Sequence, residues 1–183
     1  MTTILLLCGS LRTGSTNEAL LRTVEDIAPS DVTTVFYAGL AALPHFNPDD
    51  DADPLPAAVA SLREAVADAD AILICTPEYA GTLPGSFKNL LDWTVGGTEI
   101  SAKPTAWLNA ATPGRGGGAV ATLRTVLTYT DAAIVEAACV AVPIDRQTVG
   151  PDGVSTDPTT RARLVEALDV LVKSVPPSVV TVP

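Results

Sequence analysis

Short apolar runs alternate along the chain with longer segments whose apolar residues recur every three or four positions. The short runs predict buried strands, and the longer period predicts amphipathic helices. The predicted strands are Thr3–Cys8, Val32–Tyr37, Ala71–Cys75, Pro104–Ala110 and part of Ala133–Val142. The predicted helices are Thr16–Ala28, Leu55–Ala69, Pro84–Trp93, the segment from Gly118 to about Tyr129, and the segment from Asp157-Pro158 to about Ser174.

This alternation of strands and helices predicts a parallel sheet with helices on both faces. Five strands with the first inside the sheet give the order 2-1-3-4-5, a doubly wound α/β fold. Strands 1, 3 and 4 are then neighbours, so the loops after them meet at the carboxyl edge, where such sheets bind ligands. No repeat or domain boundary is evident, so residues 1–183 are expected to form one domain, with 176–183 as a loosely packed tail.

The loop after the first strand, Cys8–Glu18, is rich in glycine and hydroxyl side chains and leads directly into a helix. A helix N-terminus attracts anions through its free N–H groups and its dipole. Polar side chains add further donors, and one of them adds a positive charge. These residues are Ser10, Arg12, Ser15, Thr16 and Asn17.

Gly9 and Gly14 have the spacing of a nucleoside-triphosphate loop, but Ser15 stands where that loop requires lysine. The loop therefore favours a terminal phosphate, as on a mononucleotide, over a triphosphate that is hydrolysed. A simple helix cap remains an alternative, because Ser15 and Glu18 also have the spacing of a capping box.

The loops after strands 3 and 4 have compositions suited to a flat ligand. The first, Pro77–Gly81, reads P-E-Y-A-G and offers an aromatic side chain beside a glycine that permits close approach. The second, Thr112–Gly118, has four glycines at 114, 116, 117 and 118. Each could be an ordinary turn or connector, but three unusual loops at one edge favour a single site.

The predicted crevice lacks the side chains that hydrolytic or metal chemistry needs. No histidine or lysine lies near a candidate nucleophile, and no histidine–cysteine cluster or carboxylate pair is present. His45, the only histidine, and the aspartates at 49, 50, 51 and 53 fall in a proline-rich loop that is expected to be solvated. A bound cofactor is therefore expected to supply the chemistry, with no catalytic side chain and no metal.

Composition limits the partners and the compartment. The net charge of −10, from 21 acidic and 11 basic residues, argues against nucleic acid and anionic membranes. Met1-Thr2-Thr3 carries no basic residue, so no signal peptide is expected, and no apolar run reaches the length that a membrane-spanning helix needs. The odd number of cysteines, Cys8, Cys75 and Cys139, predicts buried, reduced thiols in a cytoplasmic protein.

Two stretches resemble the signatures of the NADPH-dependent FMN reductase family, which has a flavodoxin-like fold. They are G-S-L-R-x-G-S-x-N at Gly9–Asn17 and P-E-Y-x-G-x-x-P-G-x-x-K-N-x-x-D-W at Pro77–Trp93. P-G-R-G-G at Pro113–Gly117 resembles that family's third flavin loop, and L-P-x-F-N-P-D at Leu43–Asp49 resembles its second connection. The resemblance extends over nearly the whole chain.

The resemblance implies an enzyme that binds FMN and takes hydride from NADPH or NADH. Electrons would pass to a quinone, a free flavin or a similar small acceptor. The FMN phosphate would be held by Ser10, Arg12, Ser15, Thr16 and Asn17. Further cofactor contacts are implied for Pro77, Glu78, Tyr79, Ala80, Gly81, Thr112, Gly114, Arg115, Gly116 and Gly117.

The resemblance has further implications for single residues, for assembly and for alternative functions. Ala80 replaces the asparagine that the family usually has, so a side-chain bond from this position would be lost. Arg115 is a candidate partner for the 2′-phosphate of NADPH. The family also implies a homodimer or homotetramer, with Pro84–Trp93 near the interface. A flavodoxin-like electron carrier without NAD(P)H turnover, or a flavin-free sensor, is the alternative, whereas unclustered cysteines disfavour an iron–sulfur protein.

Overall fold

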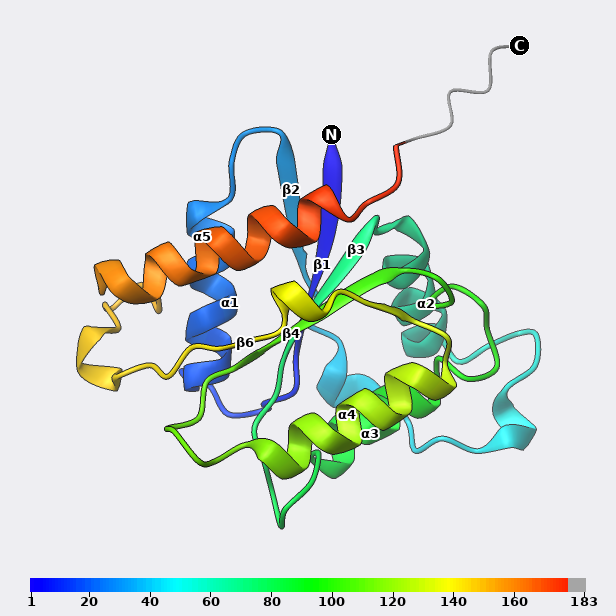
Figure 1. Cartoon of the computed structure of the whole chain (residues 1–183). Coiled ribbons are helices and arrows are strands. Elements are labelled where there is room, and N and C mark those ends of the chain that lie inside the picture. Colours follow the sequence, from blue (N-terminus) through cyan, green and yellow to red (C-terminus); the bar gives the residue numbers. More distant parts are fainter. Residues whose placement is uncertain (178–183) are drawn as a thin grey trace.

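The computed structural model describes residues 1–177 and contains one parallel sheet covered by helices on both faces (Figure 1). The strand order β2-β1-β3-β4-β5 confirms the predicted order, and β6 also pairs with β4. The strands are β1 (Thr2–Cys8), β2 (Val32–Phe36), β3 (Ala71–Cys75), β4 (Pro104–Asn109), β5 (Ala133–Ile134) and β6 (Val140–Ala141). The tail predicted for 176–183 lies outside the described residues, apart from Pro176 and Pro177.

Side chains of the central strands alternate between two apolar clusters. In β1, Leu5 and Leu7 pack with α2 (Ala57–Asp68), α3 (Gly85–Asp92) and α4 (Gly117–Tyr129). Ile4 and Leu6 pack on the other face with α1 (Thr16–Ile27) and α5 (Pro158–Lys173). Because both faces of β3 are buried, this strand is apolar throughout, as the sequence indicated, and the central residues of β1 are apolar for the same reason.

The fifth predicted strand is wrong in one respect, because the structure divides it into two. A 3₁₀ turn at Glu136–Ala138 separates β5 from β6, so the sheet has six strands instead of five. Ala138 is completely buried in the cluster that includes α5. The chain therefore leaves the sheet edge to pack this small residue inward, and ladder pairing with β4 is interrupted there.

The K-N-x-x-D-W part of the second signature fastens the connection between β2 and α2. The side-chain amide of Asn89 accepts a hydrogen bond from Phe46 N at 2.7 Å and donates one to Pro44 O at 2.8 Å. Trp93 Nε1 donates to the same carbonyl at 2.8 Å, and its ring meets Phe46 edge to face. These residues therefore hold a neighbouring segment in place, and exposed His45 lies within that segment.

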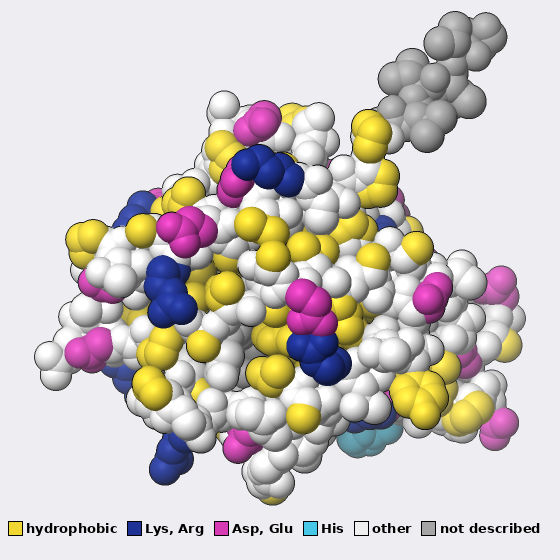
Figure 2. Space-filling view, in the orientation of Figure 1, with side chains coloured by type: hydrophobic (Ala, Val, Ile, Leu, Met, Phe, Trp, Pro, Cys, Tyr) yellow, Lys and Arg dark blue, Asp and Glu magenta, His cyan; other side chains and the backbone are white. Residues whose placement is uncertain are grey.

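Phe87, Leu90, Leu91 and Trp93 are buried within this chain, so they are core residues and not exposed interface residues. The face shown in Figure 2 carries dispersed charges of both signs, with apolar side chains gathered across its middle. Within residues 1–177, no helix combines the length and apolar character required to cross a membrane.

Candidate functional site

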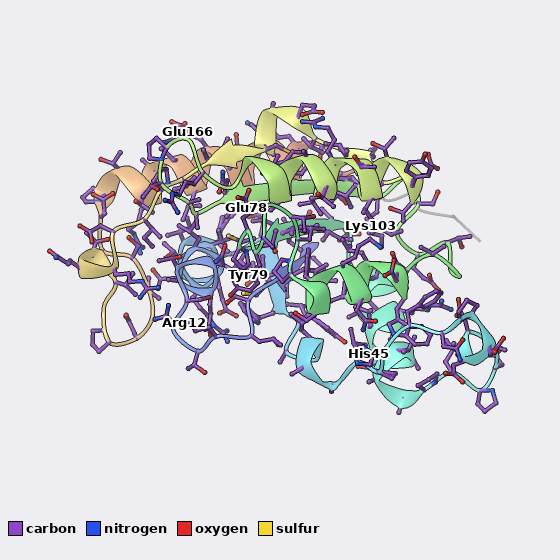
Figure 3. All side chains as sticks on the ribbon, turned by 90° about the horizontal axis from the view of Figure 1, so that it is seen from below. Arg12, His45, Glu78, Tyr79, Lys103 and Glu166 are labelled. Atoms are coloured by element: carbon purple, nitrogen blue, oxygen red, sulfur yellow. The ribbon has the colours of Figure 1, made fainter. Side chains whose placement is uncertain are left out.

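The loops after β1, β3 and β4 meet at the carboxyl edge of the sheet, which faces the viewer in Figure 3. Together they line a hollow of about 190 Å³, called the central hollow below. Its residues are Thr16, Asn17, Thr76, Pro77, Glu78, Asn109, Ala110, Ala111, Arg115 and Gly116. The convergence expected from the strand order is therefore present.

Loop one, Ser10–Asn17, is held by a cap at the start of α1. Ser15 Oγ accepts a hydrogen bond from Glu18 N at 3.1 Å, which confirms the predicted cap. Glu18 differs from the usual capping box, because its Oε2 accepts from Gly14 N at 3.0 Å instead of from Ser15 N. The cap and the anion site are compatible, since capping uses only one of the N–H groups at this helix start.

Most of the donors in loop one have no partner within the described chain. The backbone N–H groups without one include those of Thr13, Ser15, Thr16 and Asn17. Arg12 forms no ion pair with any residue from 1 to 177, and its backbone N–H is tied to Ser10 Oγ at 3.2 Å. N–H groups at a helix start, hydroxyls and one guanidinium are the donor set that a phosphate needs.

Loop two, Pro77–Gly81, forms a tight two-residue hairpin. Tyr79 and Thr82 exchange backbone hydrogen bonds of 3.0 and 3.1 Å across the turn. The two central residues both have positive φ, 51° at Ala80 and 77° at Gly81, which is characteristic of a type I′ turn. Such turns favour Asn-Gly, so an asparagine in place of Ala80 would have a conformational advantage besides any contact of its side chain.

Loop two is clamped to loop three, Thr112–Gly118, by a carboxylate. Glu78 Oε2 accepts hydrogen bonds from Gly118 N at 2.7 Å and Ala119 N at 3.2 Å, at the start of α4. The backbones also touch, because a Cβ on Gly118 would lie 2.0 Å from Gly81 O. Gly118 is therefore required for the contact between the two loops themselves.

Asn109, the last residue of β4, shapes loop three from inside. Its Oδ1 accepts from Ala111 N at 3.0 Å, and its Nδ2 donates to Arg115 O at 3.1 Å. A Cβ on Gly116 would lie 2.4 Å from Asn109 Oδ1, so this glycine makes room for the amide. Asn109 was not among the residues predicted for the site, although a polar residue at the end of a buried strand is a signal for it.

The predicted site residues are distributed over the central hollow, two neighbouring hollows and positions outside all three. Thr16, Asn17, Pro77, Glu78, Arg115 and Gly116 line the central hollow. Ser10 and Arg12 line a neighbouring hollow beside β2, and Ser15 lines a third hollow together with Arg146. None of these three hollows is lined by Tyr79, Ala80, Gly81, Thr112, Gly114 or Gly117. Besides Asn109, the prediction missed Thr76, Ala110 and Ala111.

The titratable groups of the described chain offer no nucleophile or metal site. Burial raises the pKa of the Cys8 and Cys75 thiols, and it raises that of Cys139 to about 11. Residues 1–177 contain no cluster of three histidine, cysteine or acidic side chains suited to a metal ion. A hollow of about 360 Å³ between α1 and α5 contains three carboxylates and no basic side chain, which makes it unsuitable for a phosphate.

Comparison with known proteins gives one consistent result. The family described as NADPH-dependent FMN reductase matches residues 2–147. A 2-hydroxy-1,4-benzoquinone reductase of a Burkholderia species is 32% identical over 171 residues, covering 91% of this chain and 92% of that protein. An NAD(P)H-dependent FMN reductase of Pseudomonas aeruginosa is 38% identical over 132 residues, or 70% of each chain. The solved flavoenzyme FerB of Paracoccus denitrificans, an NAD(P)H:(acceptor) oxidoreductase, has a TM-score of 0.75 and 27% identity, covering 94% of this chain and 98% of that one.

Proposed function

Because the chain belongs to the NADPH-dependent FMN reductase family, we propose that it is an FMN-dependent oxidoreductase. It takes electrons from NAD(P)H and delivers them to a quinone, a flavin or a similar small acceptor. The observation that carries the proposal is the set of unpartnered donors in loop one, at a hollow that all three loops line.

The donors of loop one hold the FMN phosphate. Arg12 supplies the positive charge, the hydroxyls of Ser10, Ser15 and Thr16 donate hydrogen bonds, and Asn17 and the start of α1 add N–H groups. FMN, when bound, supplies the hydride and electron transfer for which the chain has no side chain.

Loops two and three position the ring end of FMN. The residues proposed for this end are Pro77, Glu78, Tyr79, Ala80, Gly81, Thr112, Gly114, Arg115, Gly116 and Gly117. Glu78 acts by holding the two loops together, since its carboxylate is bonded to α4. The backbone N–H groups of Gly116 and Gly117, which have no partner in the described chain, stabilise negative charge beside the ring.

Arg115 is proposed to recognise the 2′-phosphate of NADPH. It lines the central hollow, is exposed, and forms no ion pair within residues 1–177. Arg115→Ala should reduce the preference for NADPH over NADH, whereas Arg163→Ala, an exposed arginine on α5, should leave it unchanged. An unchanged preference in Arg115→Ala would refute this role.

The visible spectrum of the purified protein tests the main proposal. We expect a flavin spectrum, present on purification or after FMN is added, that bleaches when NADPH is mixed in without oxygen. A coloured protein that keeps its spectrum with both NADPH and NADH would instead be an electron carrier. A colourless protein that does not take up FMN would refute the proposal.

We also propose that the protein works in the cytoplasm as a homodimer or homotetramer, organised as one domain. Three free cysteines support a reducing compartment. The apolar side chains gathered on the face in Figure 2 support self-association. Light scattering after size exclusion should give a mass two or four times that of the chain, and a monomer would contradict this part.

A further inference from the structure

Cys75, the last residue of β3, lies directly beneath the point where the three loops meet. It is completely buried, and its Sγ donates a hydrogen bond to Asn17 Oδ1 at 3.3 Å. Asn17 stands in the first turn of α1 and lines the central hollow, with only 6% of its surface exposed. A buried thiol thus contacts the polar head of a residue at the site.

The other end of the Asn17 amide faces the hollow. Nδ2 has no hydrogen-bond partner among the described residues. Among residues 1–177, only Tyr37 Oη is a fully buried side-chain nitrogen or oxygen without a hydrogen-bond partner. Since Asn17 Nδ2 also lacks a partner, it must be accessible at the surface. The carboxamide therefore points its oxygen inward to the thiol and its NH₂ group to the accessible surface.

The Cys75 thiol is suited to hold the Asn17 carboxamide in this orientation, because it remains a hydrogen-bond donor. Burial raises the pKa of Cys75 well above its ordinary value, although a hydrogen bond with the Ala110 backbone partly opposes this effect. The thiol consequently stays protonated and remains a donor. Ala110 directly follows β4, and Asn17 lies at the start of α1, after β1. Cys75, at the end of β3, therefore contacts the segments that follow both neighbouring strands.

We propose that Cys75 is a positioning residue, whose S–H group fixes the Asn17 carboxamide so that its NH₂ donates to an oxygen of bound FMN. The phosphate and the ring carbonyls of FMN are acceptors, so an amide turned the other way would bring two acceptors together. The inference rests on the proposed function, because it requires FMN in the central hollow.

A double-mutant cycle on FMN affinity tests this role. The full-length chain is freed of flavin, and the quenching of FMN fluorescence on rebinding gives Kd for wild type, Cys75→Ala, Asn17→Ala and the double variant. Cys75→Ala should weaken FMN binding about fivefold, as expected for one hydrogen bond. In the Asn17→Ala background the same substitution should have almost no effect, because the amide that it orients is gone.

Rescue and control variants separate positioning from packing. Cys75→Ser keeps a donor and should bind FMN within about twofold of wild type, given the size of a neutral hydrogen bond. Cys139→Ala removes a partly buried thiol that bonds within its own segment, and it should not change Kd. If Cys75→Ala does not fold, Cys75→Val fills the site without a donor and serves in the same cycle.

The outcomes are distinct. An equal loss from Cys75→Ala in both backgrounds, no loss in either, or a serine variant as weak as alanine would overturn the proposal. Riboflavin identifies the acceptor: a loss for FMN alone points to the phosphate, and a loss for both ligands points to the rest of the flavin. If wild type itself does not bind FMN, the proposed function fails, and that result differs from all of these.

Discussion

Loop one and the pair formed by loops two and three use their polar groups in opposite ways. In loop one, the Arg12 guanidinium and several backbone N–H groups have no partner within residues 1–177. In the pair, Glu78 is bonded to the start of α4, and Asn109 is bonded to Arg115 O in loop three and to Ala111 N just before it. One region keeps donors available, whereas in the other the side chains of Glu78 and Asn109 are bonded to the loop backbone.

The difference indicates that loop one supplies binding affinity, whereas loops two and three supply a fixed shape. Free donors can bind a charged group strongly, because they lose no internal hydrogen bond when the ligand arrives. Loops that are bonded to each other have a fixed shape and can hold a planar group without reorganising. Substitutions in loop one should therefore change affinity with little effect on folding, and substitutions in the pair should do the reverse.

The largest effect is expected at the contact between loops two and three. Gly118→Ala places a Cβ 2.0 Å from Gly81 O, and relieving this overlap should lower the free energy of unfolding by about 3 kcal/mol. Gly117→Ala is the matched control, because its Cβ meets nothing and should raise stability by about 0.5 kcal/mol. Urea unfolding of both variants measures the difference, and equal stabilities would show that the loops separate easily.

Arg12 should give the largest effect on affinity. Arg12→Ala removes a charged donor and should weaken FMN binding about thirtyfold, with riboflavin binding unchanged because riboflavin has no phosphate. Fluorescence titration with both ligands measures this, and Arg163→Ala serves as the control for a lost positive charge. Equal losses for FMN and riboflavin would contradict a phosphate contact.

Glu78 tests the clamp from the side of loop two. Glu78→Ala leaves two N–H groups at the start of α4 without an acceptor and should lower the free energy of unfolding by about 1.5 kcal/mol. FMN affinity should fall less than in Arg12→Ala. Glu166→Ala removes an exposed carboxylate on α5 that forms no ion pair within residues 1–177, and it should lower the free energy of unfolding by less than about 0.5 kcal/mol. Similar stabilities for the two variants in thermal or urea unfolding would exclude the clamp.

The smallest effect, and a gain, is expected in the hairpin of loop two. Ala80 has a φ of 51°, which costs energy for alanine but is better tolerated by asparagine. Ala80→Asn should raise the free energy of unfolding by about 0.5 to 1 kcal/mol. Ala121→Asn, at an exposed helical position, should lower it by about 0.6 kcal/mol. If both substitutions destabilise the protein in urea unfolding, the turn does not favour asparagine.

The sequence predicted most of the elements because their signals are local. The apolar run Ala71–Cys75 is β3 in full, and the Asp157-Pro158 pair marks the start of α5. The fifth strand was only partly right, because its interruption depends on Ala138 packing against a helix that lies 20 residues further on. Local periodicity carries no information about such a contact.

In the site, too, local features were predictable and contacts between distant residues were not. Loop composition identified where a ligand binds, and the order of the strands brought those loops together. The sequence did not reveal that Glu78 is hydrogen-bonded to Gly118, 40 positions away, or that Cys75 is hydrogen-bonded to Asn17, 58 positions away. It also could not show that Asn89 and Trp93 fasten a neighbouring connection.

By itself the sequence determined the alternation of strands and helices, the helix cap at Ser15, the donors of loop one and the family. These depend on residues that are close together in the chain or that occur in a characteristic order. Only the tertiary structure decided which polar groups remain free and which are bonded to each other. The reason is physical: a hydrogen bond between loops requires donor and acceptor to lie about 3 Å apart, and the packing of strands and helices decides which distant residues come that close.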